Sequence, residues 1–307
     1  ENDFSINSDG YITNYKGNLK EFIIPETING ITVTGVAERG LDNDNIVSIV
    51  LPDTLTHIDD YGLISSNAIY ISSKGLVSIG LQGISCPDVV IFDSPNLELV
   101  DSIKLGVREI NFSKLSKMGK SAFASFEHLK CANIPLITEI PRFAFSNCFV
   151  LREVNCPLVT SIDFGAFSNC YWLKKIDFTN VEKLIASQTR KDTGTFRKCV
   201  NLTEVCFPNL TTIEGFSLFE ECYGLTKIDL PKAETICKNA FKNCILLSEV
   251  NLPNVQIVED YAFSGTSSLT QLTLENTKEI GNYVFQNAEI EMLNAPELKS
   301  IGKYLFA

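Results

Sequence analysis

Residues 240–263 read AFKNCILLSEVNLPNVQIVEDYAF, and this frame returns through most of the chain. It starts at Ala240-Phe241 and starts again at Ala262-Phe263, 22 residues later. We call the phenylalanine of the frame, or the aliphatic residue in its place, the anchor. The anchors are Leu41, Leu63, Ile84, Leu105, Phe123, Phe145, Phe167, Phe196, Phe219, Phe241, Phe263, Phe285 and Phe306. A constant period of about 20 to 50 residues predicts stacked repeats.

Each repeat contains one short predicted strand. Val250 and Leu252 flank the polar Asn251, and this alternation has the period of a half-buried strand. A proline such as Pro253 often follows and ends the strand, because it lacks the amide donor that a ladder needs. Another aliphatic residue, Val258, comes five positions later, and the next Ala-Phe pair predicts one helical or 3₁₀ turn. One coil cannot bury its own apolar edge, so neighbouring coils must cover it.

This pattern resembles the BspA type of leucine-rich repeat, whose frame is close to Cys-x-x-Leu-x-x-Ile-x-Leu-Pro and then Leu-x-x-Ile-Gly-x-x-Ala-Phe. The matching residues in one repeat are Cys244, Leu247, Val250, Leu252, Pro253, Val258, Ala262 and Phe263. Asp or Glu often stands where the family has Gly. The resemblance covers roughly residues 36–307. It implies an α/β fold, rich in strand and poor in helix: a right-handed leucine-rich repeat solenoid of about 12 coils with a parallel β-sheet on its concave face.

The first 35 residues follow a different pattern. Residues 4–6 and 11–15 flank the turn pair Asp9-Gly10, and residues 22–25 and 31–33 flank Asn29-Gly30. Such pairs between short apolar runs are strong hairpin signals. We therefore expect residues 1–35 to form an N-terminal β-hairpin cap over the first coil, and residues 36–307 to form one continuous solenoid.

Composition excludes several functional classes. The chain carries 37 acidic and 26 basic residues and a formal charge of −11, which argues against nucleic acid and anionic membranes as partners. No apolar run approaches the roughly 18 residues of a membrane helix, so we expect no direct membrane insertion. The sequence opens on polar residues, Glu1-Asn2-Asp3, and a mature secreted chain whose signal or lipoprotein peptide has been removed would look the same.

The ten cysteines are expected to be structural. Five of them, Cys148, Cys170, Cys199, Cys222 and Cys244, stand three residues after an anchor, where a small apolar thiol suits the core. The chain has no CxxC pair, and its two histidines stand apart from the cysteines, so neither zinc nor another cofactor is expected. Disulfides between neighbouring coils remain an open alternative. Cys131 and Cys206 fall on outward strand positions, where a thiol would be more reactive.

The candidate ligand-binding residues project outward from the predicted strands. They are Asn133, Glu153, Asn155, Lys175, Asp177, Glu204, Lys227, Asp229, Glu249 and Asn251. The alternative is a solvated sheet face without a ligand. A column of single carboxylates does not converge on one point, which argues against calcium.

A second candidate is an insertion of about seven residues in the 29-residue step between Phe167 and Phe196. Its polar residues are Gln188, Arg190, Lys191 and Asp192. Insertions in a solenoid become edge loops, which often bind ligands, although a tolerated surface loop is the alternative. The aromatic residues Tyr171, Trp172 and Tyr223 are expected on the turns before the strands, either half-buried or exposed as anchors for a protein or a sugar.

No catalytic pattern is present, and we expect no enzyme activity. The motifs GxSxG, HExxH, GxGxxG and the P-loop are absent, and His57 and His128 occupy ordinary exposed repeat positions. The resemblance implies adhesion by a cell-surface or secreted bacterial protein that binds protein or glycan ligands through its sheet face. Two alternatives remain: a structural scaffold that forms homodimers through a solenoid end, and an intracellular interaction scaffold, for which the location would be cytoplasmic.

Overall fold

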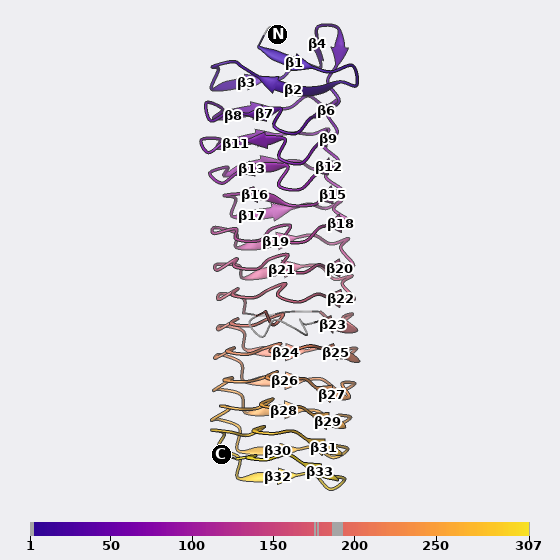
Figure 1. Ribbon diagram of the computed structural model, residues 1–307, viewed down its shortest axis with the longest axis vertical. Helices are drawn as coiled ribbons and strands as arrows, with labels where there is room; N and C mark the ends of the chain where they lie inside the picture. Colours follow the sequence, from indigo (N-terminus) through magenta and orange to yellow (C-terminus); the bar gives the residue numbers. More distant parts are fainter. Residues whose placement is uncertain (1–2, 175, 177, 186–192, 307) are drawn as a thin grey trace. The chain divides into compact units, whose positions relative to one another are not determined.

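The computed structural model describes residues 3–174, 176, 178–185 and 193–306. The chain falls into two compact units, unit 1 (Glu1–Ile137) and unit 2 (Thr138–Ala307). Within each unit, short strands of successive coils lie one above another and are joined by turns (Figure 1). The described ranges contain strands and turns but no helix.

Unit 1 contains three stacks of strands that run through successive coils, together with a parallel pair and a small hairpin. The seven-stranded stack consists of β1 (Phe4–Ile6), β2 (Tyr11–Tyr15), β6 (Gly35–Val36), β9 (His57–Ile58), β12 (Ser78–Ile79), β15 (Leu99–Val100) and β18 (Lys117–Met118). The two four-stranded stacks are β7 (Leu41–Asp42), β10 (Leu63–Ile64), β13 (Ile84–Cys86), β16 (Ile103–Leu105), and β3 (Glu21–Ile23), β8 (Ser48–Val50), β11 (Tyr70–Ser72), β14 (Ile91–Asp93). The parallel pair is β17 (Glu109–Asn111) with β19 (Cys131–Asn133), and the hairpin is β4 (Thr27–Ile28) with β5 (Ile31–Thr32).

The N-terminal segment contains both predicted hairpins. β1 and β2 pair antiparallel around Asp9-Gly10, and β4 and β5 pair antiparallel around Asn29-Gly30. β3, which the sequence places in the second hairpin, instead pairs parallel with β8 of the first coil. The rings of Phe4, Tyr15 and Phe22 pack together with centroids 4.7 to 6.0 Å apart, which covers the start of the core.

Unit 2 repeats a simpler coil, in which most turns of the chain carry two short strands. One stack consists of β20 (Glu139–Ile140), β22 (Ser161–Ile162), β23 (Lys183–Ile185) and β25 (Thr212–Glu214), and another of β27 (Thr235–Ile236), β29 (Ile257–Val258), β31 (Glu279–Ile280) and β33 (Ser300–Ile301). The strands predicted from the sequence pattern are β21 (Glu153–Asn155), β24 (Glu204–Cys206), β26 (Lys227–Asp229), β28 (Glu249–Asn251), β30 (Gln271–Thr273) and β32 (Met292–Asn294). The stacks through the Val258 position were not assigned as strands from sequence.

Equivalent residues of successive coils lie opposite each other. Lys227 pairs with Glu249 and Asp229 pairs with Asn251, in each case 22 residues further along the chain. An amino-acid type that recurs with the repeat therefore becomes a column in space. The predicted fold class, a solenoid of parallel strands, is confirmed in this respect.

The anchor segments hold the coils together through their backbone. The amide of Phe241 donates to the carbonyl of Ala262 in the next coil at 2.8 Å, whereas the amide of Lys242 donates to Asn239 at 3.2 Å within a local turn. This alternation recurs at the other anchors of unit 2 from Phe145 to Phe285. Because every second amide is directed at the neighbouring coil, the helical or 3₁₀ turn expected here is not formed.

The same alternation requires left-handed backbone at fixed positions. The residue two before the anchor has a positive φ at Arg39, Tyr61, Gln82, Ser121, Phe143, Gly165, Ser217, Asn239, Tyr261, Tyr283 and Tyr304. The residue two after the anchor has one at Ser125, Asn147, Asn169, Lys198, Glu221, Asn243, Gly265 and Asn287. Asn and Gly tolerate this conformation best, which explains their frequency after the anchor.

The anchor rings form a continuous aromatic column in unit 2. Between Phe145 and Phe263, successive rings lie 5.2 to 5.4 Å apart and are parallel within 17°. These rings are at most 1% exposed, as predicted for the core. Phe306 is an exception, because it is 57% exposed.

The five cysteines after the anchors form a second buried column. The thiol of Cys244 donates to the carbonyl of Phe219 at 3.1 Å, and Cys170, Cys199 and Cys222 make the equivalent bond to the anchor of the preceding coil. Eight of the ten cysteines are buried thiols, while Cys131 is half-buried and Cys206 is exposed. Burial raises the pKa of the Cys222 thiol to about 12, so it carries no thiolate near neutral pH.

We expect Phe219→Ala to lower the free energy of unfolding by about 3 to 5 kcal/mol, because it removes a buried ring and leaves a cavity. Phe219 stacks on Phe196 at 5.2 Å and on Phe241 at 5.4 Å. Phe149→Ala is the matched control, since that ring is exposed, and it should cost less than about 1 kcal/mol. Urea denaturation followed by circular dichroism measures both, and equal losses would contradict the assigned repeat phase.

Thiol reactivity should divide the cysteines into two classes. With Ellman's reagent at mildly alkaline pH, we expect Cys206 and then Cys131 to react in the native protein, and the eight buried thiols to react only after denaturation. Mass spectrometry of the labelled peptides identifies the sites. Rapid native labelling of Cys222 or Cys244 would show that the column is open to solvent.

Candidate functional site

The candidate site lies on three neighbouring strands of unit 2. In β24, β26 and β28 the central residues Val205, Ile228 and Val250 face the core, so their neighbours on either side project outward. The outward residues are Glu204, Cys206, Lys227, Asp229, Glu249 and Asn251, and they make up what we call the sheet face. It includes five of the residues predicted from sequence.

Side chains of the sheet face contact one another from coil to coil. The Lys227 ammonium lies 3.4 Å from a carboxylate oxygen of Glu249, and both side chains are more than half exposed. The Asn251 side-chain amide donates to Asp229 at 2.8 Å, and the other carboxylate oxygen of Asp229 accepts from the Cys206 thiol at 3.8 Å. Exposed ion pairs of this kind contribute about 0 to 1 kcal/mol to folding. The stability of the fold therefore does not require this charge pattern.

The other predicted residues are placed separately. Glu153 and Asn155 are exposed on β21 of unit 2. Asn133 lies on β19 of unit 1, where its side-chain amide donates to Asn111 at 2.7 Å. Lys175, Asp177, Gln188, Arg190, Lys191 and Asp192 lie outside the described residues.

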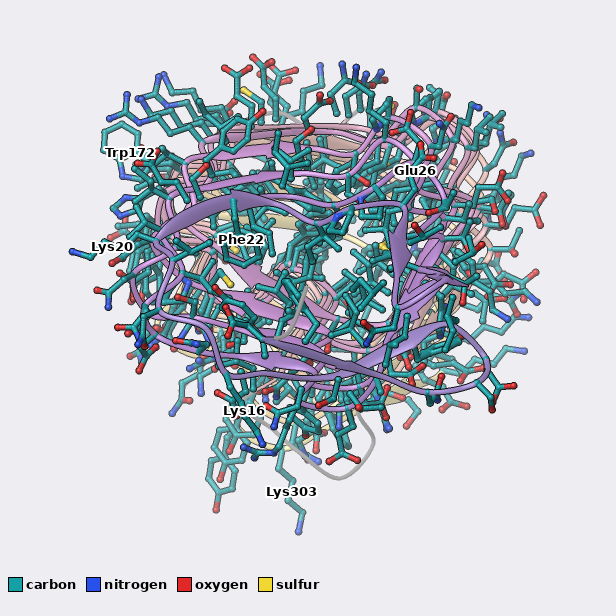
Figure 2. All side chains as sticks on the ribbon, turned by 90° about the horizontal axis from the view of Figure 1, so that it is seen from above. Lys16, Lys20, Phe22, Glu26, Trp172 and Lys303 are labelled. Atoms are coloured by element: carbon teal, nitrogen blue, oxygen red, sulfur yellow. The ribbon has the colours of Figure 1, made fainter. Side chains whose placement is uncertain are left out.

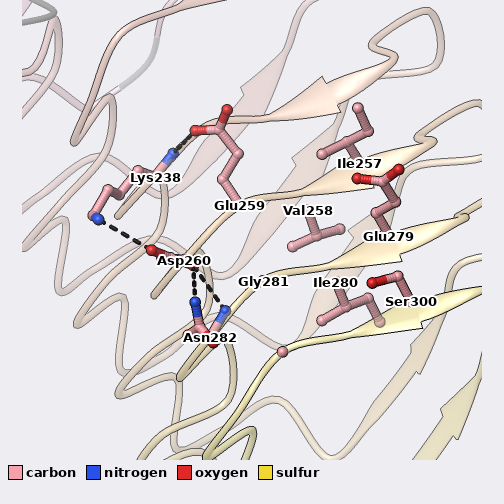
Figure 3. Close-up of a pocket in the computed structure, with 11 residues that line it drawn as sticks. Lys238, Ile257, Val258, Glu259, Asp260, Glu279, Ile280, Gly281, Asn282 and Ser300 are labelled. Carbon is pink, nitrogen blue, oxygen red and sulfur yellow. Dashed lines mark hydrogen bonds and ion pairs between the residues drawn. The ribbon is translucent and has the colours of Figure 1, made fainter.

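A recess of about 380 Å³ lies at a different edge of unit 2, where the chain turns after β29, β31 and β33 (Figure 3). Its polar groups form a ladder. The Lys238 ammonium lies 3.1 Å from Asp260, and Asn282 donates its backbone and side-chain amides to Asp260 at 2.8 and 3.0 Å. The side-chain oxygen of Asn282 accepts from the Lys303 amide in turn. These bonds link successive coils, so the recess is primarily a structural joint.

Two features show how tightly this joint is packed. A Cβ on Gly302 would lie 2.4 Å from the Gly281 carbonyl carbon, so only glycine permits this approach of successive coils. Burial by itself would raise the pKa of Asp260, but hydrogen bonds from Asn282 and Lys238 and the Lys238 charge outweigh it, so that the pKa lies below its ordinary value. The ionised carboxylate is thus the form that the fold stabilises.

His57 joins two side chains on the seven-stranded stack of unit 1. Its Nδ1 contacts the Ser78 hydroxyl, and its Nε2 lies 3.1 Å from Asp59. The His57 and Asp59 side chains are more than one third exposed, and the Ser78 amide already donates to the Thr56 carbonyl. The trio therefore lacks the water-excluded surroundings that acyl transfer uses, and the Ser78 amide is not free to act as an oxyanion donor. No group of three or more His, Cys, Asp or Glu residues in the described ranges is placed to hold a metal ion.

Sequence reasoning missed two sets of surface residues. The ladder residues Asp260, Asn282 and Lys303 each stand three residues before an anchor. A polar residue that recurs at one repeat position predicts a polar column, so the sequence did carry a signal for this ladder. The second set is apolar: Phe149, Tyr171, Trp172, Tyr223, Ile245 and Leu246 are 37 to 49% exposed on the turns before the strands. Of these, only Tyr171, Trp172 and Tyr223 stood out in the sequence.

Comparison with known proteins identifies the type of repeat. A family model described as "BspA type Leucine rich repeat region (6 copies)" matches residues 104–189 and 189–307. Comparison with curated proteins finds no match.

Among solved structures, the chain is similar to a leucine-rich repeat protein from Bacteroides ovatus, with a TM-score of 0.71 and 20% identity over 97% of this chain and 88% of that one. It is also similar to a leucine-rich cell surface protein from Faecalibacterium prausnitzii, with a TM-score of 0.50 and 20% identity over 95% and 92% of the two chains. At these identities the likeness establishes the fold. No helix among the described residues is long and apolar enough to cross a lipid bilayer.

The lowered pKa of Asp260 makes its contribution to stability dependent on pH. A carboxyl group whose pKa is depressed on folding stabilises the protein above its unfolded pKa, and this stabilisation is lost as the pH falls through the lower, folded pKa. At pH 7 we expect Asp260→Ala to cost about 1 to 3 kcal/mol through the lost charged hydrogen bonds. The difference in free energy of unfolding between the variant and the unaltered protein should become smaller below pH 3.8, the ordinary pKa of an aspartate. Urea titrations across this pH range measure the difference. A difference that stays constant would contradict the stabilising role of the ionised Asp260.

Proposed function

The chain belongs to the BspA-type leucine-rich repeat family, and from this premise we propose that it is a non-enzymatic interaction module of a cell-surface or secreted bacterial protein. Its ligand is a protein or a glycan, held by the sheet face. The observation that carries the proposal is a cluster of exposed, mixed-charge side chains on rigid, adjacent strands. The similar protein from Faecalibacterium prausnitzii is a leucine-rich cell surface protein, which supports the location.

The physical case rests on pre-organisation. The strands beneath the sheet face are held by a column of rings that are at most 1% exposed, so a ligand does not have to order them on binding. The outward Glu204, Lys227 and Glu249 alternate in charge from coil to coil. Such a pattern favours a ligand of complementary pattern and repels others, which is how electrostatics confers specificity.

A binding screen with two matched variants tests the proposal. The probes are extracellular matrix proteins and a glycan array. The test variant reverses Glu204 and Glu249 of the sheet face to Lys, together with Glu153, which is exposed on β21. The control variant reverses Glu234, Glu275 and Glu297 to Lys, which changes the net charge equally at exposed positions outside the sheet face.

We expect the unaltered protein to bind at least one probe, the test variant to bind it roughly tenfold more weakly or worse, and the control to bind it normally. A hit weakened equally by both variants would indicate a general charge effect. A hit that neither variant weakens would place the binding surface elsewhere. Either result, or the absence of any hit, would contradict the proposed role of the sheet face.

A further inference from the structure

Unit 2 carries a row of exposed apolar side chains on the turns between the anchors and the outward strands. These turns belong to the coils that start at Phe145, Phe167, Phe196, Phe219 and Phe241. The row consists of the exposed Phe149, Tyr171, Trp172, Tyr223, Ile245 and Leu246 together with the half-buried Val200, and we call it the apolar stripe. Figure 2 shows the Trp172 side chain at the periphery, outside the ribbon.

The stripe is continuous from coil to coil. The Phe149 and Tyr171 rings stack with their centroids 5.3 Å apart. The backbones of the turns are also bonded: Trp172 donates to the Phe149 carbonyl at 3.3 Å, and Gly224 donates to the Val200 carbonyl at 3.0 Å. Neighbouring members therefore form one surface and are not isolated apolar residues.

The fold does not require apolar residues at this position. In the coil that starts at Phe263, the equivalent residues are Ser267 and Ser268, and in the coil that starts at Phe123 they are Glu127 and His128. Both coils close their turns with these polar residues. Apolar residues occupy this position in five consecutive coils, and contiguous exposed patches of this kind mark interaction sites.

The spacing of the coils indicates which backbone fits the stripe. The Phe149 and Tyr171 rings of the stripe lie 5.3 Å apart, and the buried anchor rings repeat at 5.2 to 5.4 Å. The hydrogen-bonded strands of successive coils lie about 4.8 Å apart. An α-helix rises about 5.4 Å per turn, so a helix parallel to the stacking direction would drift from the coils by at most about 2.4 Å over four steps, less than half a coil. An extended strand repeats one face about every 6.8 Å and would drift by about 6 to 8 Å over four steps, at least one whole coil.

We propose that the apolar stripe docks an amphipathic α-helix of about 18 residues from a partner protein, aligned along the stacking direction, with one apolar side chain per coil. The polar residues Asn147, Asn169 and Asn243 border the stripe on one side, and Thr203, Thr226 and Ser248 border it on the other. They match the polar flanks of such a helix. At the Trp172 end, the Arg152 guanidinium lies 5.6 Å from the Trp172 ring and Lys174 is exposed, so acidic residues on the helix are favoured there.

This surface is distinct from the sheet face, and its test does not depend on the ligand of the sheet face. The probe is a fluorescein-labelled synthetic peptide with leucine at positions i, i+4, i+7, i+11 and i+14, and with Ala, Glu and Lys elsewhere. The comparison peptide has the same composition with leucine at alternate positions, which is the strand pattern. Binding is followed by fluorescence anisotropy.

Substitutions at exposed positions locate the contact with little risk to folding. The stripe variant carries Trp172→Ser and Tyr223→Ser. The matched control carries Leu158→Ser and Ile257→Ser, which remove exposed apolar side chains of unit 2 outside the stripe. The third variant is the one that tests the sheet face, with Glu204 and Glu249 and the β21 residue Glu153 reversed to Lys. Thermal unfolding by circular dichroism checks that each variant is folded.

We expect saturable binding of the helix-pattern peptide, with the strand-pattern peptide roughly tenfold weaker or worse. The stripe variant should bind the helix-pattern peptide roughly tenfold more weakly or worse. The control and sheet-face variants should bind it with the affinity of the unaltered protein. The proposal is overturned if the helix-pattern peptide does not bind, if both peptides bind equally, or if the stripe variant binds as well as the control. In each of these cases the proposed function of the sheet face is left to its own test.

Discussion

The structure depends on how each coil shares its backbone amides. In the anchor segments of unit 2 from Phe145 to Phe285, alternate amides donate to a carbonyl of the next coil, and the amides between them close a local turn. This requirement excludes a helix and is met with left-handed backbone on both sides of most anchors of unit 2, and on the C-terminal side alone at Phe196. It also brings each anchor ring to between 5.2 and 5.4 Å of the next along the Phe145–Phe263 column. The stacking therefore follows from the backbone ladder, and burial of the rings then stabilises it.

The same ladder explains why surface properties appear as columns. Because equivalent residues face each other in register, a substitution that recurs with the repeat is copied along the surface at the spacing of the coils. The sheet face and the apolar stripe both arise in this way, on strands and turns whose positions are set by the buried columns beneath them. Neither surface is needed for packing, since other coils carry different residues at the same positions. Their chemistry is therefore open to selection by a partner.

Much of the core could be predicted from the period alone. The buried anchors, the leucine at Leu247, the cysteine column and the outward direction of Asn251 all follow from counting offsets. The strands of two residues, such as Ile257–Val258, could not be predicted, because so short a segment shows no alternation. The left-handed positions were partly signalled by Asn147, Asn169 and Asn243, but Phe143 and Tyr261 adopt the same backbone without a favourable side chain. The exposure of Trp172 depends on the orientation of its turn, which no local pattern determines.

Amide hydrogen exchange in unit 2, resolved by NMR, tests the central claim most directly. The account predicts that the amides of Phe219, Phe241 and Phe263, which donate to Ala240, Ala262 and Val284, exchange among the slowest in the protein and at similar rates. Exchange of these three amides as fast as in exposed turns would contradict the account, because it would mean that the bonds between coils do not hold the stack together.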